Sequence, residues 1–129
     1  MLERLLITGA AGGIGREMRM RLSHVAKIIR VSDKNAMEIA SSNEEVMLCD
    51  LADKDAVFKI VEGCDGILHL GGISIEESWT PIRNGNIDGI FNLYEAARLL
   101  DHPRIIFAST NHTVGFYPQQ QLIDSKVYP

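Results

Sequence analysis

Seven residues near the start of the chain, Gly9-Ala10-Ala11-Gly12-Gly13-Ile14-Gly15, have the composition and spacing of a turn that binds phosphate. An apolar segment precedes the turn and an amphipathic segment follows it, so the turn joins an expected strand to an expected helix. Small residues let the backbone approach a pyrophosphate, and a helix N-terminus offers unpaired N–H groups. The run predicts a dinucleotide site with five phosphate-side residues: Gly9, Gly12, Gly13, Ile14 and Gly15. A tight turn without a ligand is the alternative.

Two carboxylates follow the next expected strands. Asp33 comes after Gly15 at close to the roughly 20-residue offset at which a carboxylate meets the adenosine ribose. This position favours NAD over NADP, because a 2′-phosphate would face like charge, although Lys34 and Arg30 are close in sequence. Asp50-Leu51 follows the third expected strand, at the place of the adenine ring. A surface role for Asp33, and a capping or surface role for Asp50, remain open.

These residues need a sheet whose strand ends meet at one edge. Short aliphatic runs predict five strands at 4–8, 27–32, 46–48, 66–70 and 104–108. Amphipathic segments alternate with them, which predicts an α/β fold, a Rossmann-type doubly wound parallel sheet. In the first helix Ile14, Met18, Leu22 and Val25 share one face. Asp53 is a candidate cap for the second helix, and the longest helix runs from 81 or 83 to 100.

Length and composition bound the class of protein. With 129 residues, 46% hydrophobic and 23% charged, the chain fits a single soluble domain. A net charge of −4 argues against nucleic acid or an anionic membrane as partner. No leader pattern or long apolar run is present, which favours the cytoplasm. Cys49 and Cys64 lack the spacing of metal ligands, so no metal is expected.

Other polar residues are expected to have structural roles. His69 lies inside an apolar strand, where a hydrogen-bonded core histidine is more common than a ligand. The acidic pairs Glu44-Glu45 and Glu76-Glu77 are interpreted as solvated loop residues, because adjacency alone does not create acid–base chemistry.

Three motifs resemble those of the extended, epimerase/dehydratase-like branch of the short-chain dehydrogenase/reductase superfamily. They are Thr8-Gly9-x-x-Gly12-x-x-Gly15, Asp50-Leu51 and Asn86-x-x-Gly89-x-x-Asn92. Within that branch, residues 69–74 and 107–115, followed by Tyr117-Pro118, resemble the uronate dehydrogenases.

The resemblance implies NAD-dependent oxidation of D-galacturonate or D-glucuronate at the anomeric carbon, giving an aldarolactone. Ser74 would sit where cofactor and sugar acid meet, and Thr110 would occupy the catalytic Ser/Thr position. Asn111 and His112 would bind the substrate, although a polar turn after a strand is the alternative for both. The nicotinamide side of the cofactor would be lined by Leu70, Gly71, Gly72, Ile73 and Ser74.

In the family the general base is a tyrosine with a lysine four residues later, and this sequence contains no such pair. Tyr94 is followed at that spacing by Arg98 and Tyr117 by Gln121, while Tyr128 is too near the end. Residues 1–129 are therefore interpreted as the NAD-binding N-terminal part of a longer enzyme, inactive when isolated. We expect an unpaired edge at the fifth strand, and marginal stability or association with another chain. By resemblance, the long helix predicts a homo-oligomer.

Two other functions remain open. One is a non-catalytic dinucleotide-binding or sensing module, which needs no tyrosine–lysine pair. The other is a nucleotide-sugar epimerase or dehydratase, which the run from Ser109 to His112 disfavours.

Overall fold

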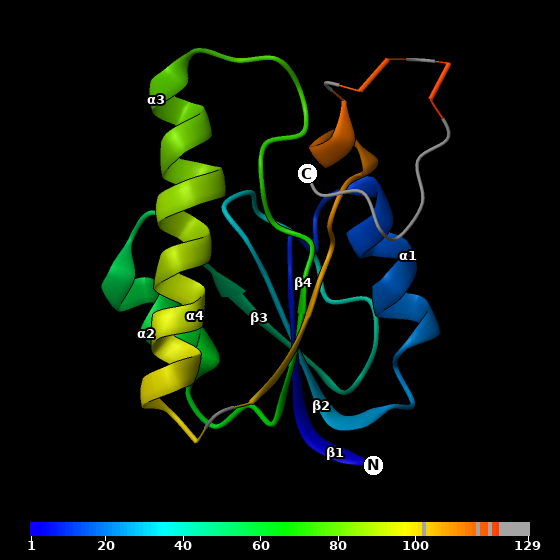
Figure 1. The fold of residues 1–129 in the computed structure, drawn as a ribbon. Coiled ribbons are helices and arrows are strands. Elements are labelled where there is room, and N and C mark those ends of the chain that lie inside the picture. The colour runs from blue at the N-terminus through cyan, green and yellow to red at the C-terminus, as the bar shows by residue number, and fades with distance from the viewer. Residues whose placement is uncertain (102, 116, 119, 122–129) are drawn as a thin grey trace.

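A computed structural model describes residues 1–101, 103–115, 117–118 and 120–121. Within them, five parallel strands form one sheet in the order β3-β2-β1-β4-β5 (Figure 1). The strands are β1 (Leu2–Thr8), β2 (Ala26–Asp33), β3 (Glu44–Leu48), β4 (Gly66–His69) and β5 (Arg104–Phe107). The order reverses at β1, which is the switch point of a doubly wound sheet. The expected fold is confirmed, and each expected strand is present with bounds shifted by one or two residues.

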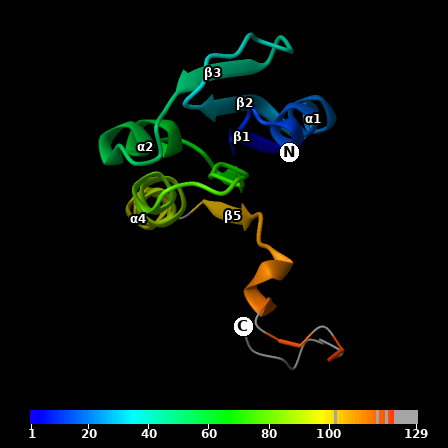
Figure 2. The same ribbon diagram turned by 90° about the horizontal axis from the view of Figure 1, so that it is seen from above.

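Helices cover both faces of this sheet (Figure 2). Helix α1 (Gly13–Arg21) packs on one face, and α2 (Lys54–Val61) and α4 (Gly89–Leu99) pack on the other. The expected long helix is a continuous rod of α3 (Trp79–Ile82), a π-helical turn η1 (Arg83–Asp88) and α4 (Figure 1). A 3₁₀ turn, η2 (Asn111–Val114), follows β5 and stands away from the sheet. None of the helices in the described ranges has the length and hydropathy to cross a membrane.

Alternation along β1 divides the core into two clusters. Leu6 faces α2 and α4 and packs with Val57, Ile67 and Leu93. Its neighbours face α1 instead, and Ile7 packs with Ile29, Val31 and Ala10. Burying one such aliphatic side chain contributes about 1.5–3 kcal/mol, so the strand that carries the glycine turn is anchored from both faces.

The expectation that Glu44 and Glu45 are solvated loop residues is wrong. Both belong to β3, and the Glu44 side chain is fully buried against Arg19 of α1. Arg19 Nε and Nη2 donate to the two carboxylate oxygens at 2.9 and 2.7 Å. Glu45 instead accepts from Arg30 Nε of β2 at 2.9 Å. The two glutamates were misassigned because each arginine partner is distant in sequence.

Apolar side chains remain exposed in two places. Along the rod, Ile87, Phe91 and Tyr94 point outward, whereas Leu93 and Ala96 pack against the sheet. At the outer edge of the sheet, Ile106 of β5 is 62% exposed. Within the described residues β5 pairs with β4 alone and forms an edge of the sheet.

Candidate functional site

The glycine-rich turn is held at the C-terminal end of β1. Gly9 has φ of +69°, and a Cβ there would lie 2.7 Å from the backbone of Leu70 and Gly71. Gly15 faces the same turn, where a Cβ would collide with the Gly9 carbonyl oxygen and approach Ala10 Cα to 2.7 Å. Glycine is therefore required at both ends of the turn, by close backbone packing and at Gly9 also by a positive φ.

The start of α1 is open toward the edge of the sheet. Gly12 caps the helix without a side-chain bond, and a Cβ on Gly13 would meet nothing within 4 Å. The first N–H groups of a helix lack intrahelical partners and lie at the positive end of its dipole, so this helix start has the chemistry of an anion-binding site. Ile14 is 66% exposed, so it does not take part in the apolar packing of α1 against the sheet. The buried residues of α1 are Gly15 and Arg19, because the turn lies too close to the sheet for a large side chain there.

Asp33 is the last residue of β2 rather than the residue after it, and its carboxylate bridges two loops. Oδ2 accepts a hydrogen bond from Ala11 N at 3.1 Å, and Oδ1 accepts one from Asn35 N at 3.0 Å. The carboxylate therefore sits beside the glycine turn and half-buried at the rim. This is the place expected for the residue that meets the adenosine ribose.

Asp50 and Leu51 lie on the loop after β3. Asp50 is exposed, and its Oδ1 accepts from Ala52 N at 2.9 Å, which is a local turn contact. Leu51 is half-buried between two glycines, because a Cβ on Gly71 would come 2.8 Å from Leu51 Cδ1 and one on Gly89 2.8 Å from Leu51 Cβ. Leu51 thus joins the loop after β3 to the loop after β4.

A buried hydrogen-bond chain fixes the beginning of the loop after β4. Gly71 N donates to Thr8 Oγ1 at 3.2 Å, and Thr8 Oγ1 lies 2.6 Å from His69 Nδ1. The hydroxyl has two lone pairs and one proton, so it accepts from Gly71 N and shares a second hydrogen bond with His69 Nδ1. Burial lowers the pKa of His69 to about 4, so the ring is neutral, and it stacks on Phe107 with centroids 5.6 Å apart. The prediction of a hydrogen-bonded core histidine is confirmed.

The predicted substrate residues lie after β4 and β5, whose ends are joined by a bond from Ala108 N to His69 O at 3.1 Å. Thr110 caps η2 and accepts from His112 N at 3.2 Å, and its Oγ1 lies 3.0 Å from His112 Nδ1. Thr110, His112 and Ser74 are all exposed. Asn111 opens η2, but its side chain lies outside the described part of the chain, as does Tyr128.

Sequence reasoning missed two asparagines on the rod that contact the loops after β3 and β4. Asn86 pairs with the backbone of Ile73, and Asn92 donates to the carbonyl of Leu51. The motif that contains them was recognised, but the partners of both side chains are set by tertiary packing.

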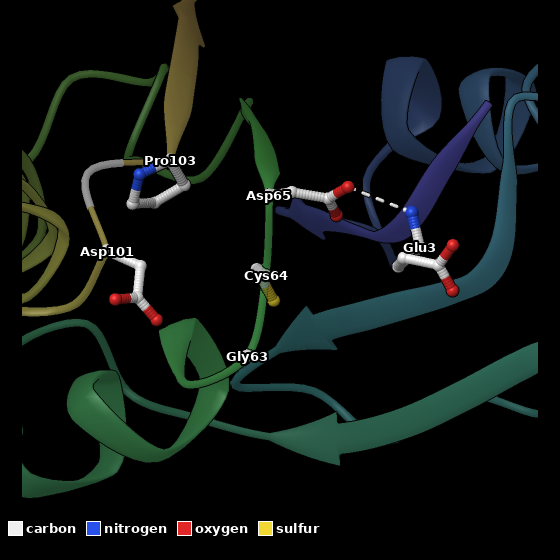
Figure 3. A pocket seen from close by; sticks show the side chains of 6 residues that line it. All are labelled: Glu3, Gly63, Cys64, Asp65, Asp101 and Pro103. Atoms are coloured by element: carbon white, nitrogen blue, oxygen red, sulfur yellow. Dashed lines mark hydrogen bonds between the residues drawn. The ribbon is translucent and has the colours of Figure 1, made fainter.

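A concave region lies at the opposite end of the sheet and is lined by Glu3, Gly63, Cys64, Asp65, Asp101 and Pro103 (Figure 3). The Asp65 carboxylate there accepts hydrogen bonds from Glu3 N at 2.8 Å and Arg4 N at 2.7 Å, so its role is to hold the start of β1. Burial raises the pKa of the Cys64 thiol to about 11, which makes it unreactive near neutral pH. No group of three or more His, Cys, Asp or Glu residues in the described ranges has a metal-binding arrangement. The cofactor edge is therefore the stronger candidate.

Comparison with known proteins assigns the fold and motifs to a family. The model of the NAD dependent epimerase/dehydratase family matches residues 5–129. The chain belongs to this family. Uronate dehydrogenases from Agrobacterium fabrum and Pseudomonas putida are 54% and 53% identical to it over 98% and 95% of its length. These matches cover 48% and 46% of the two relatives, so the chain spans about half the length of the curated relatives it matches.

Solved structures of this family superpose closely on the chain. A mutant of Agrobacterium tumefaciens uronate dehydrogenase complexed with NAD gives a TM-score of 0.89 at 55% identity, over 94% of this chain and 46% of that one. Glucuronic acid dehydrogenase from Chromohalobacter salexigens gives 0.92 at 53% identity, over 98% and 48%. A more distant relative, L-arabinose 1-dehydrogenase (NAD(P)(+)) from Haloferax volcanii, is 32% identical over 90% of this chain and 44% of its own length.

Proposed function

We propose that this chain is the NAD-binding part of a hexuronate dehydrogenase, which oxidises D-galacturonate or D-glucuronate at the anomeric carbon to an aldarolactone. The observation that carries the proposal is the 52–54% identity to three uronate dehydrogenases over nearly the whole chain. The glycine turn, Asp33 and the loop after β4 lie at one edge of the sheet, and this arrangement supports an NAD site there. Residues 1–129 would form one unit of a longer enzyme.

The residues of this chain would hold the cofactor along the C-terminal edge of the sheet. The N-terminus of α1 would bind the pyrophosphate, Asp33 the adenosine ribose, and Asp50 with Leu51 the adenine. The loop of residues 70–74 would then lie along the nicotinamide. Bound NAD would supply the hydride acceptor. A 2′-phosphate would meet the Asp33 carboxylate, which supports NAD over NADP.

The sugar acid would lie between the loops that follow β4 and β5. Thr110 would hydrogen-bond the reacting oxygen, and Asn111 and His112 would bind the rest of the substrate. Ser74 would contact both substrate and cofactor. The sequence contains no tyrosine with a lysine four residues later, so the chain by itself would bind NAD without oxidising a sugar.

The test is made on the protein expressed from the native gene. We expect NADH absorbance to appear with D-galacturonate or D-glucuronate and not with L-arabinose, a neutral sugar. His112→Ala should lower kcat/KM for the uronate by about tenfold or more and leave NAD affinity within about twofold. NAD binding without oxidation of either uronate would favour a non-catalytic binding module. Unchanged uronate oxidation in His112→Ala would refute the assigned role of His112.

We further propose that the rod of α3, η1 and α4 forms the interface of a homo-oligomer. Its exposed apolar side chains, Ile87, Phe91 and Tyr94, suit a self-complementary interface. Phe91→Lys should convert the oligomer to a smaller species in analytical ultracentrifugation. Because Phe91 is exposed in the single chain, the substitution should not lower the Tm of the monomer. A sedimentation coefficient that Phe91→Lys does not change would contradict this interface.

We also propose that the protein is cytoplasmic. Two buried, unpaired cysteines support this location, and cell fractionation tests it.

A further inference from the structure

We propose that Asn86 and Asn92 are positioning residues, each of which fixes one of the two loops against which NAD lies. Asn86 holds the loop after β4, on the nicotinamide side, and Asn92 holds the loop after β3, on the adenosine side. One helical rod would thereby set the distance between the two ends of the cofactor site. The inference rests on the proposed NAD binding.

Asn86 uses both ends of its amide on a single residue of the loop. Ile73 N donates to Asn86 Oδ1 at 2.7 Å, and Asn86 Nδ2 donates to Ile73 O at 2.9 Å. A Cβ on Gly72 would lie 3.0 Å from Asn86 Oδ1, so the amide also abuts the preceding residue. These two hydrogen bonds to one residue fix the direction of the backbone between Gly71 and Ser74.

Asn92 makes the corresponding contact with the other loop. Its side chain is buried, and Nδ2 donates to Leu51 O at 2.9 Å and lies 3.4 Å from Ala52 O. One turn earlier, Gly89 lets the rod approach this loop, because a Cβ there would lie 2.8 Å from Leu51 Cβ. The backbone of the predicted adenine residue is therefore held directly by α4.

The two asparagines lie on different kinds of helix. Asn86 is within the π-helical turn η1, and Asn92 is within α4. A π-helical turn is wider than an α-helical one, and such turns concentrate at functional sites. Here the turn changes the phase of the rod between the two contacts. This local departure is explained if both side chains must reach backbone at the same edge of the sheet.

Calorimetric binding of NAD and of ADP tests the proposal, because ADP carries the adenosine and both phosphates but no nicotinamide. Asn86→Ala should weaken NAD about tenfold, as expected for loss of a paired hydrogen bond, and leave ADP within about twofold. Asn92→Ala should weaken both ligands about tenfold. Asn86→Asp, which keeps the acceptor for Ile73 N, should recover part of the NAD affinity. Asn84→Ala, an exposed asparagine in the same turn, is the matched control and should change neither affinity.

The outcomes separate this inference from the proposed function. Failure of the unsubstituted protein to bind NAD and ADP would refute the NAD site itself. Normal binding by that protein with equal weakening of both ligands in Asn86→Ala would overturn the assignment of Asn86, as would unchanged NAD affinity. Thermal unfolding of each variant shows whether a loss follows from general destabilisation. If Asn92→Ala does not fold, Asn92→Ser keeps a short donor, and a selective loss of NAD without ADP there would overturn the adenosine arm.

Discussion

Asp33 and Thr110 each lie at or just beyond the C-terminal end of a strand at the same edge of the sheet, yet their surroundings differ. The Asp33 carboxylate accepts from the backbone of two loops, and its strand β2 lies between β1 and β3. Thr110 is exposed and bonds within η2, and its strand β5 pairs with β4 alone in the described chain. The proposed adenosine side is therefore positioned by contacts with neighbouring loops, whereas the proposed substrate side is positioned mainly by its own turn.

The same contrast appears in the side chains of the two strands. Val31 in β2 is completely buried, whereas Ile106 in β5 is 62% exposed. Both are β-branched residues in parallel strands, so their different burial comes from the neighbouring strands and helices rather than from residue type. Substitutions in strands β1–β3 should consequently change the free energy of unfolding, and substitutions in η2 should change kcat/KM for the proposed substrate.

The buried ion pair between Arg19 and Glu44 gives the largest expected effect. Arg19→Met leaves the Glu44 carboxylate buried and unpaired, so the free energy of unfolding should fall by about 3–5 kcal/mol. The exposed pair of Arg21 and Glu17 is the matched control, and Arg21→Met should cost less than about 0.5 kcal/mol. Urea unfolding measures both changes, and equal losses would contradict the contrast between buried and exposed pairs.

Acid should remove the contribution of this pair. The hydrogen bonds from Arg19 hold the pKa of Glu44 below its ordinary value, so the folded chain binds that proton less readily than the unfolded chain. The stabilisation is therefore complete above the ordinary glutamate pKa and is lost as the pH falls through the lowered one. The Tm difference between the unsubstituted protein and Glu44→Gln should close in that acid range. A difference that is independent of pH would refute the linkage.

Two glycines of the turn, Gly13 and Gly15, give the next largest effect. Gly15→Ala places a Cβ against the backbone of Gly9 and Ala10 and should cost about 1–3 kcal/mol, with NAD binding reduced as the turn shifts. Gly13→Ala places its Cβ in open space and should raise stability by up to about 1 kcal/mol, because alanine favours the helix. Thermal unfolding distinguishes them. Similar shifts in both variants would show that the close packing at Gly15 has little energetic effect.

The smallest stability effects are expected at Asp33 and Thr110. Asp33→Ala removes the acceptor for Ala11 N and should lower stability by about 1 kcal/mol, and it should weaken NAD and relax discrimination against NADP. Thr110→Ala should change stability by less, because its contacts lie within one exposed turn. Binding of NAD and NADP is measured by calorimetry. An unchanged preference in Asp33→Ala would exclude the ribose role.

The parts of the fold that follow from local patterns were predictable from sequence. The five strands, the glycine turn and the cap at Asp53, which accepts from Asp55 N and Ala56 N at 3.0 Å, depend on neighbouring residues and apolar spacing. Pairing of Glu44 with Arg19 depends on how β3 packs beside α1, which no local pattern reveals. The contact between Asn86 and Ile73 likewise needs the π-helical turn. Local patterns therefore predict the elements of the proposed cofactor edge, whereas the contacts that hold its loops depend on the folded arrangement.

The central place of β1 also affects how the chain folds as it is made. Leu5 is synthesised before both of its partners, Ile29 in β2 and Gly66 in β4. Until those segments emerge, the apolar run from Leu5 to Ile7 has neither of its neighbouring strands, although all three residues are buried in the finished sheet. Non-local strand pairing slows folding and leaves apolar surface accessible. Of the five strands described, the one that carries the glycine turn is thus synthesised earliest and keeps one open side until β4 emerges, so chaperone assistance during translation should matter for this segment.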